Sequence, residues 1–176
     1  MTDKPPRLRA DELTPGVSAN GPLEQAIAKF AAAAVRAKSV DPVITELVRL
    51  RCAQIHDCRL CGSLRNREAL EQGFDESMQR KIAAYESSDF SPDIIAALRL
   101  CDAIILSPSF ADAELKQQLE RCFSATQIAE ICFDVMKWSQ QKALVALRLE
   151  APPWDTTNVL FFDEEGNPGF GGPAYD

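Results

Sequence analysis

Signals for the start of a helix recur along this chain, and they constrain its fold more than any other feature. Asp41-Pro42 and Ser91-Pro92 each combine a typical N-cap residue with proline at the first helical position. Ser124 and Gln127 have the spacing of a capping box. The segments that follow carry apolar residues at helical spacing, and no segment shows the alternation of a half-buried strand. The sequence therefore predicts an all-α domain of about seven helices.

The expected helices follow from this spacing and from the residues that cap or end each one. They cover residues 23–38, 42–56, 58–72, 75–85, 92–106, 112–122 and a long stretch from 124 to about 150. Asp57 is expected to cap the third helix, and Gly73 is expected to end it.

The 176 residues fit one domain with a hydrophobic core, flanked by two segments of different composition. Residues 1–22 are rich in proline and glycine and predict an irregular arm, whereas 23–150 predict the helical domain. The tail, 151–176, places several aromatic residues among proline and glycine. Since burial of aromatic rings is favourable, we expect the tail to pack over its own core or a neighbouring subunit.

The charge of the chain narrows its partners and its location. A formal net charge of −7 opposes nonspecific binding to nucleic acid or to an anionic membrane. The N-terminus lacks the apolar stretch of a signal peptide, and the most apolar run, 93–106, is too short and too charged to span a bilayer. A cytoplasmic protein is expected, in which the six cysteines are mostly free thiols.

Cys58 and Cys61 form a Cys-x-x-Cys pair at the expected start of the third helix. Residues three apart share a helix face, so their sulfurs can meet. The positive end of the helix favours thiolate over thiol there. A reactive thiolate with a second thiol beside it is what peroxide reduction and disulfide exchange require.

Glu46 lies twelve residues before Cys58, too far to reach the thiols along one straight helix. If the chain turns at His56 and Asp57, Glu46 comes level with Arg65, one helical turn from Cys61. The three side chains then form a polar cluster. Two interpretations stay open: Glu46 and Arg65 form a buried ion pair, or Glu46 relays a proton while Arg65 holds the thiolate charged. His56 either approaches the pair or, as we favour, is a half-exposed residue at a helix end.

Metal binding is the rival chemistry for the same segment. Cys52, His56, Cys58 and Cys61 are four possible zinc ligands. Structural zinc usually takes two ligand pairs well separated in sequence, and the chain has no second pair of this kind. We therefore expect no metal and no organic cofactor. The remaining cysteines, Cys101, Cys122 and Cys132, are expected on apolar helix faces.

The residues from Glu46 to the Cys-x-x-Cys pair, with the segment 69–73 after them, resemble the carboxymuconolactone decarboxylase-like superfamily, in particular its alkylhydroperoxidase D branch. The resemblance covers about 43–73, with weaker agreement to about 149. It implies an all-α fold and a homo-oligomer, a trimer or hexamer, with a dimer as the alternative. By the same resemblance Cys61 attacks the hydroperoxide, Cys58 resolves the sulfenic acid, and Glu46 relays protons.

The chain departs from that branch at Arg65, where the branch often has histidine. Arginine stays protonated and cannot act as a general base, although it can stabilise a thiolate. Proton transfer must then come from Glu46, His56 or water.

Three functions follow in order of preference. The first is a thiol-dependent hydroperoxide reductase or disulfide oxidoreductase, which uses a hydroperoxide and a thiol or dithiol reductant protein. The second is decarboxylase-like or isomerase chemistry near Glu46. The third is a non-catalytic oligomer that senses redox state or binds a partner.

Overall fold

The computed structural model of the chain describes residues 22–140, 142–147 and 151–175. The arm expected at 1–22 lies outside these residues, apart from Pro22, which begins the first helix.

The described residues are mostly helical, which confirms the predicted class. The longer helices are α1 (Pro22–Ala34), α2 (Pro42–His56), α6 (Pro92–Ile105), α7 (Ala113–Cys122) and α8 (Ala125–Ser139). The shorter ones are α3 (Arg59–Gly62), α4 (Arg67–Glu71), α5 (Glu76–Lys81), α9 (Lys142–Leu147) and two 3-10 helices, Ile82–Ser87 and Pro108–Phe110.

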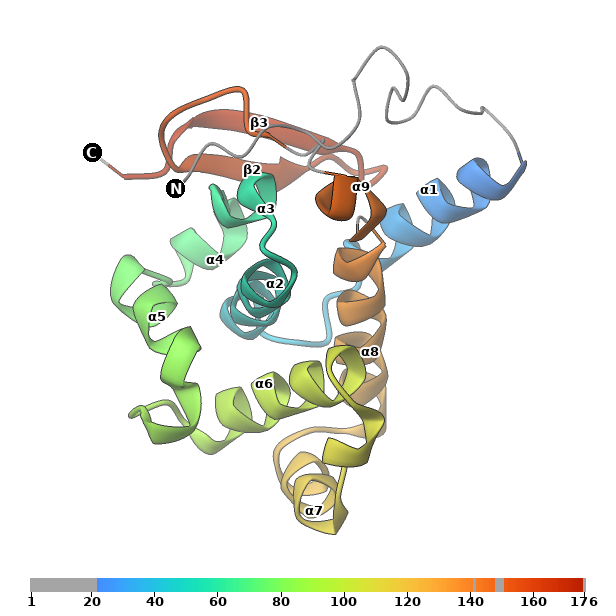
Figure 1. Cartoon of the computed structure of the whole chain (residues 1–176), viewed down its shortest axis with the longest axis vertical. Helices are drawn as coiled ribbons and strands as arrows, with labels where there is room; N and C mark the ends of the chain where they lie inside the picture. The colour runs from blue at the N-terminus through green and yellow to red at the C-terminus, as the bar shows by residue number, and fades with distance from the viewer. Residues whose placement is uncertain (1–21, 141, 148–150, 176) are drawn as a thin grey trace.

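Helix α2 runs through the middle of the molecule, seen close to end-on in Figure 1. It packs against both α6 and α8. Leu47 and Val48 of α2, Leu98 of α6 and Val135 of α8 belong to the buried core. Burial of such side chains supplies most of the free energy that holds the helices together. A rigid, buried α2 then fixes the position of whatever follows its C-terminus.

The local helix signals act as predicted at two of the starts. The Asp41 carboxylate accepts a 2.7 Å hydrogen bond from the amide of Val43, and α2 runs from Pro42 to His56. Ser124 and Gln127 form a reciprocal capping box at the start of α8. These signals depend only on neighbouring residues, so sequence alone is enough to place them.

The predicted third helix, 58–72, was wrong. Asp57 does not cap it: this residue ends α2 in the left-handed conformation, with φ 53°. Cys58 caps the short α3 instead, and a strand, β1 (Leu64–Asn66), separates α3 from α4. The Asn66 side chain accepts hydrogen bonds from two amides of α4 and so restarts the helix. The long helix expected from 124 is likewise split, since α8 ends at Ser139, and its expected end near 150 lies outside the described residues.

The tail contains two strands that the sequence did not predict. Strand β2 (Asn158–Phe162) pairs in parallel with β1, and β3 (Pro168–Pro173) pairs antiparallel to β2. Strand β1 is too short, and β3 too rich in glycine and proline, to show a strand pattern. The hairpin lies over α3 (Figure 1), so the tail packs on its own chain.

How the chain divides into domains stays a prediction. Within the described residues, no helix is long and apolar enough to cross a membrane.

Candidate functional site

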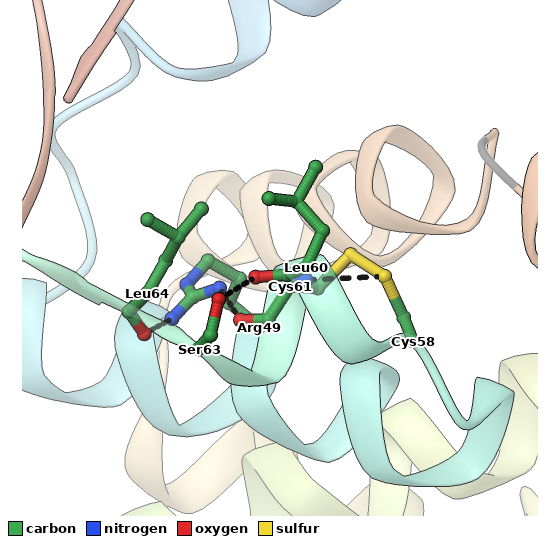
Figure 2. The surroundings of a disulfide bond; sticks show 6 residues. All are labelled: Arg49, Cys58, Leu60, Cys61, Ser63 and Leu64. Atoms are coloured by element: carbon green, nitrogen blue, oxygen red, sulfur yellow. Dashed lines mark hydrogen bonds between the residues drawn. A yellow bond between two sulfur atoms is a disulfide. The ribbon is translucent and has the colours of Figure 1, made fainter. Parts of the chain in front are cut away.

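Cys58 and Cys61 are joined by a disulfide, with 2.08 Å between their sulfurs and 5.3 Å between their Cα atoms. Asp57 reverses the chain at the end of α2, which places the disulfide at the start of α3 (Figure 2). Cys58 is 5 % exposed, whereas Cys61 is partly exposed. The spacing prediction that the two sulfurs can meet agrees with this geometry.

Helix α3 has only four residues, so the helix dipole expected to favour a thiolate is small here. A local contact takes its place: the amide of Cys61 donates to the sulfur of Cys58 at 3.2 Å. The same donor can stabilise negative charge on Cys58 when the pair is reduced.

Two buried arginines hold the segment that follows the disulfide. Arg49 of α2 donates to the carbonyl oxygens of Cys61, at 2.7 Å, and Leu64, at 2.5 Å (Figure 2). Arg65 donates to the carbonyl oxygens of Gly62, at 2.8 Å, and Leu64, at 2.7 Å. Carbonyl oxygens at the end of the short α3 and the start of β1 are thus satisfied, and two positive charges lie beside the thiol segment.

Glu46 pairs with Arg49 in place of the expected Arg65. The two carboxylate oxygens of Glu46 accept from Nε and Nη2 of Arg49, both at 2.7 Å, and the side chains are 1 % and 2 % exposed. The amide of Asn66 donates to the same carboxylate at 3.2 Å. Arg65 instead binds Glu76, at 2.9 Å. The predicted cluster of Glu46, Arg65 and Cys61 is therefore replaced by a chain of contacts from Glu46 through Arg49 to Cys61.

Sequence reasoning missed Arg49, although a signal for it was present. Glu46 and Arg49 are three residues apart on α2, the spacing at which helical side chains meet. A partner one turn away is easier to reach than Arg65, which lies beyond the chain reversal.

His56 ends α2, as predicted, and is partly buried. Its Nε2 is buried without a hydrogen-bond partner. Burial, and to a smaller extent the charge of Lys142, lowers the pKa of the imidazole. The neutral ring is thus the favoured form at neutral pH.

A pocket of about 800 Å³ opens beside the disulfide, between α2, α3 and the tail. Leu50, Ala53 and Pro152 give it apolar walls, and Trp154 adds an aromatic one. Cys58 lines the pocket, whereas Cys61 is not among the described residues that line it. A ligand in this pocket would therefore approach the disulfide from the side of Cys58.

The other cysteines lie outside the pair. The sulfurs of Cys52 and Cys101 are 3.6 Å apart between α2 and α6, and both residues are at most 1 % exposed. The contact with Cys52, together with burial, raises the pKa of the Cys101 thiol. Cys122 and Cys132 are partly buried against the core. No three potential metal ligands gather anywhere in the described part of the chain, and two of the four suggested zinc ligands are bonded to each other.

Comparison with known structures defines the class of fold. A crystal structure of a protein of unknown function from Agrobacterium tumefaciens, proposed to be the antioxidant defence protein AhpD, superposes with a TM-score of 0.66. The match covers 85 % of this chain and 100 % of that one, at 17 % identity. The chain thus has an alkylhydroperoxidase D-like fold, as the resemblance implied.

Two uncharacterized proteins of Mycobacterium tuberculosis, from strains CDC 1551 / Oshkosh and ATCC 25618 / H37Rv, resemble the chain in sequence. Each is 36 % identical over 124 residues, which cover 70 % of this chain and 44 % of the relative. The chain therefore spans less than half the length of these relatives. No protein-family model matches it.

Proposed function

We propose that this protein is a thiol-dependent hydroperoxide reductase that acts in the cytoplasm and needs no metal. The observation that carries the proposal is the Cys58–Cys61 disulfide, held at the start of α3 beside an accessible pocket. A pair that closes and reopens provides the two electrons that reduction of a hydroperoxide requires.

The cycle begins with attack by the Cys61 thiolate on the hydroperoxide. The O–O bond breaks, the alcohol leaves with a proton, and Cys61 becomes a sulfenic acid. The thiolate of Cys58 then attacks the Cys61 sulfur, which forms the disulfide and releases hydroxide, and the hydroxide takes up a proton from the solvent to become water. A dithiol reductant protein restores both thiols by exchange. The assignment of Cys61 as the attacking residue is supported by its greater exposure and by Arg49, which binds its carbonyl oxygen.

In this proposal Glu46 does not relay protons. Both of its oxygens are engaged by Arg49, so it acts as a positioning residue that fixes the guanidinium against Cys61. The proton for the leaving alkoxide comes from water, because burial lowers the pKa of His56 and leaves its ring neutral, without a readily donated proton, at neutral pH. Arg65 contributes positive charge and holds the backbone.

Stopped-flow oxidation tests the proposal. Reduced wild-type protein, mixed with cumene hydroperoxide, is expected to lose two free thiols per chain, and Cys61→Ser is expected to lose none. Cys122→Ser is the matched control, because it removes a partly buried cysteine outside the pair and should leave the rate unchanged. Wild-type thiols that react no faster than free cysteine would overturn the proposal.

We also propose that the protein forms a homo-oligomer. Ile27 of α1 and Phe133 and Met136 of α8 are 45 %, 51 % and 53 % exposed, and Phe30 packs edge-on against Phe133. Apolar surface of this kind favours contact with another subunit. Light scattering should give a mass above that of one chain, and Phe133→Glu should lower it; a wild-type monomer would refute this part. Phe110→Glu, an exposed aromatic residue between α6 and α7, is the control.

A further inference from the structure

Residues 151–157 of the tail form one wall of the pocket at the disulfide. Ala151, Pro152, Trp154, Asp155 and the threonines at 156 and 157 all line it, opposite residues of α2 and α3. The tail therefore belongs to the surroundings of the thiol pair, and a molecule that enters the pocket contacts the tail as well as Cys58.

The wall is bonded directly to the thiol segment. Nε1 of Trp154 donates to Oγ of Ser63 at 2.9 Å, and the amide of Asn158 donates to the Ser63 carbonyl oxygen at 2.9 Å. The Trp154 ring also packs on Phe170, with 5.3 Å between centroids. Ser63 is the C-cap of α3, two residues after Cys61. These contacts hold the wall at a fixed position relative to the disulfide.

Among the charged side chains that line the pocket, the negative ones outnumber the positive ones. Asp57, next to Cys58, and Asp155, on the tail wall, are negative, and Arg59 is positive. Both aspartates are exposed, so they act on a ligand mainly through a screened Coulomb interaction. A negative balance repels an anion that approaches Cys58, and the net charge of −7 on the chain adds to this effect.

We propose that the pocket walled by the tail makes Cys58 the sulfur that a reducing thiol attacks, and that Asp155 makes the pocket favour neutral and cationic thiols over anionic ones. The inference deepens the proposed function by naming the point of entry and the charge class of the reductant.

The reductant exchanges with the disulfide in two steps. The incoming thiolate attacks the sulfur of Cys58, a mixed disulfide forms there, and the bond to Cys61 breaks. Cys61 leaves as a thiolate, near the positive charge of Arg49, which binds its carbonyl oxygen. A second thiolate then attacks the sulfur of the bound thiol, which releases the oxidised reductant and leaves Cys58 as a thiolate. Water supplies the protons that the two thiolates take up.

Peptide mapping tests which sulfur is attacked. Oxidised protein is mixed briefly with 2-mercaptoethanol and quenched with N-ethylmaleimide, which caps the freed thiol before it can reclose the ring. Trypsin cleaves after Arg59, so Cys58 falls on peptide 52–59 and Cys61 on peptide 60–65. The mercaptoethanol adduct is expected on Cys58 and the maleimide on Cys61. The reverse distribution, or equal amounts of the two, overturns the inference.

A series of small thiols tests the charge preference. Cysteamine, 2-mercaptoethanol and thioglycolate are similar in size but carry positive, neutral and negative groups. Their rates of reduction of the disulfide are compared at equal thiolate concentration and low salt. The ratio of the cysteamine rate to the thioglycolate rate should fall about fourfold in Asp155→Asn, as expected in water when one unit charge about 10 Å away is removed and the two thiols differ by two unit charges.

Glu164→Gln is the matched control, since it removes the same charge from an exposed tail residue that does not line the pocket. It should leave the ratio close to that of the wild type. An unchanged ratio in Asp155→Asn, or an equal fall in both variants, overturns the charge preference. Because no hydroperoxide enters these measurements, a protein that exchanges thiols without these preferences refutes this inference alone. A protein that exchanges as described but fails to consume hydroperoxide refutes the proposed function alone.

Discussion

Arg49 and Cys61 are joined by a 2.7 Å hydrogen bond from the buried guanidinium to the carbonyl oxygen of the cysteine. The same guanidinium holds Glu46 with two further bonds, so α2 and the thiol segment share one buried ion pair. Lysine cannot reproduce this arrangement, because its single nitrogen lacks the planar fork of donors. The position of Cys61 therefore depends on a residue far inside the core.

Removal of this guanidinium should destabilise the protein strongly. Arg49→Met leaves Glu46 buried and without its cationic partner, and we expect the free energy of unfolding to fall by about 3–5 kcal/mol. Urea denaturation of the oxidised protein measures the change. Lys38→Met is the control, because the Lys38–Glu68 ion pair is exposed and should contribute less than about 1 kcal/mol. Similar losses in the two variants would contradict this account of Arg49.

Asp134 of α8 should make stability depend on pH. Burial, with a smaller contribution from Glu130, raises the pKa of this carboxyl to about 7, while Lys137 and Lys38 oppose the shift. The folded state then keeps a proton that the unfolded state releases near pH 4. Stability from this group is present at low pH and is lost as pH rises toward 7, by up to about 1.4 kcal/mol per pH unit.

Asp134→Asn removes this proton and isolates its effect. The free energy of unfolding of the variant, relative to the wild type, should increase from pH 5 to pH 7 and stay constant above pH 8. Asp75→Asn is a useful comparison, because hydrogen bonds lower the pKa of that exposed carboxyl and its pH dependence has the opposite sign. A difference between Asp134→Asn and wild type that does not change with pH would show that Asp134 ionises normally.

The remaining cysteines should divide into two classes by reactivity. Cys52 and Cys101 are fully buried, and the raised pKa of Cys101 disfavours its thiolate, so neither should react with iodoacetamide in the folded protein. Cys122 and Cys132 are partly exposed and should react slowly, with Cys132 slowed further because burial raises its pKa. Mass spectrometry after labelling gives the order. Modification of Cys101 at the rate of Cys122 would mean that α2 and α6 separate readily.

Prediction from sequence succeeded where structure depends on near neighbours. The start of α2 at Asp41-Pro42 and the capping box at Ser124 are examples, because each hydrogen bond joins residues at most three apart. The thiol pair is also local, since its two cysteines are three positions apart in the sequence.

Prediction failed where a distant segment changes the local outcome. The segment 64–66 has residues that tolerate a helix, but pairing of Leu64 with Asn158 makes it a strand. The tail strand that causes this lies more than ninety residues away, and nothing in 58–72 announces it. The partner of Glu46 was predicted wrongly for the same reason, because Arg65 comes level with Glu46 only if a continuous helix follows the turn.

Arg65→His introduces the residue that the alkylhydroperoxidase D branch often has at this position. We expect this change to lower the rate of hydroperoxide consumption. Arg65 donates to the carbonyl oxygens of Gly62 and Leu64 while it binds Glu76. An imidazole is too short and has too few donors to do all three. Arg49 still binds the carbonyl oxygen of Leu64, but that of Gly62 is left unpaired, at a cost of about 1–3 kcal/mol. The segment after Cys61 then loosens, which outweighs any gain from a new proton donor.

Initial rates with cumene hydroperoxide and dithiothreitol measure the effect. Arg80→His, an exchange outside the thiol segment, is the control. A faster Arg65→His variant would show that proton supply, rather than the hold on the backbone, limits this site.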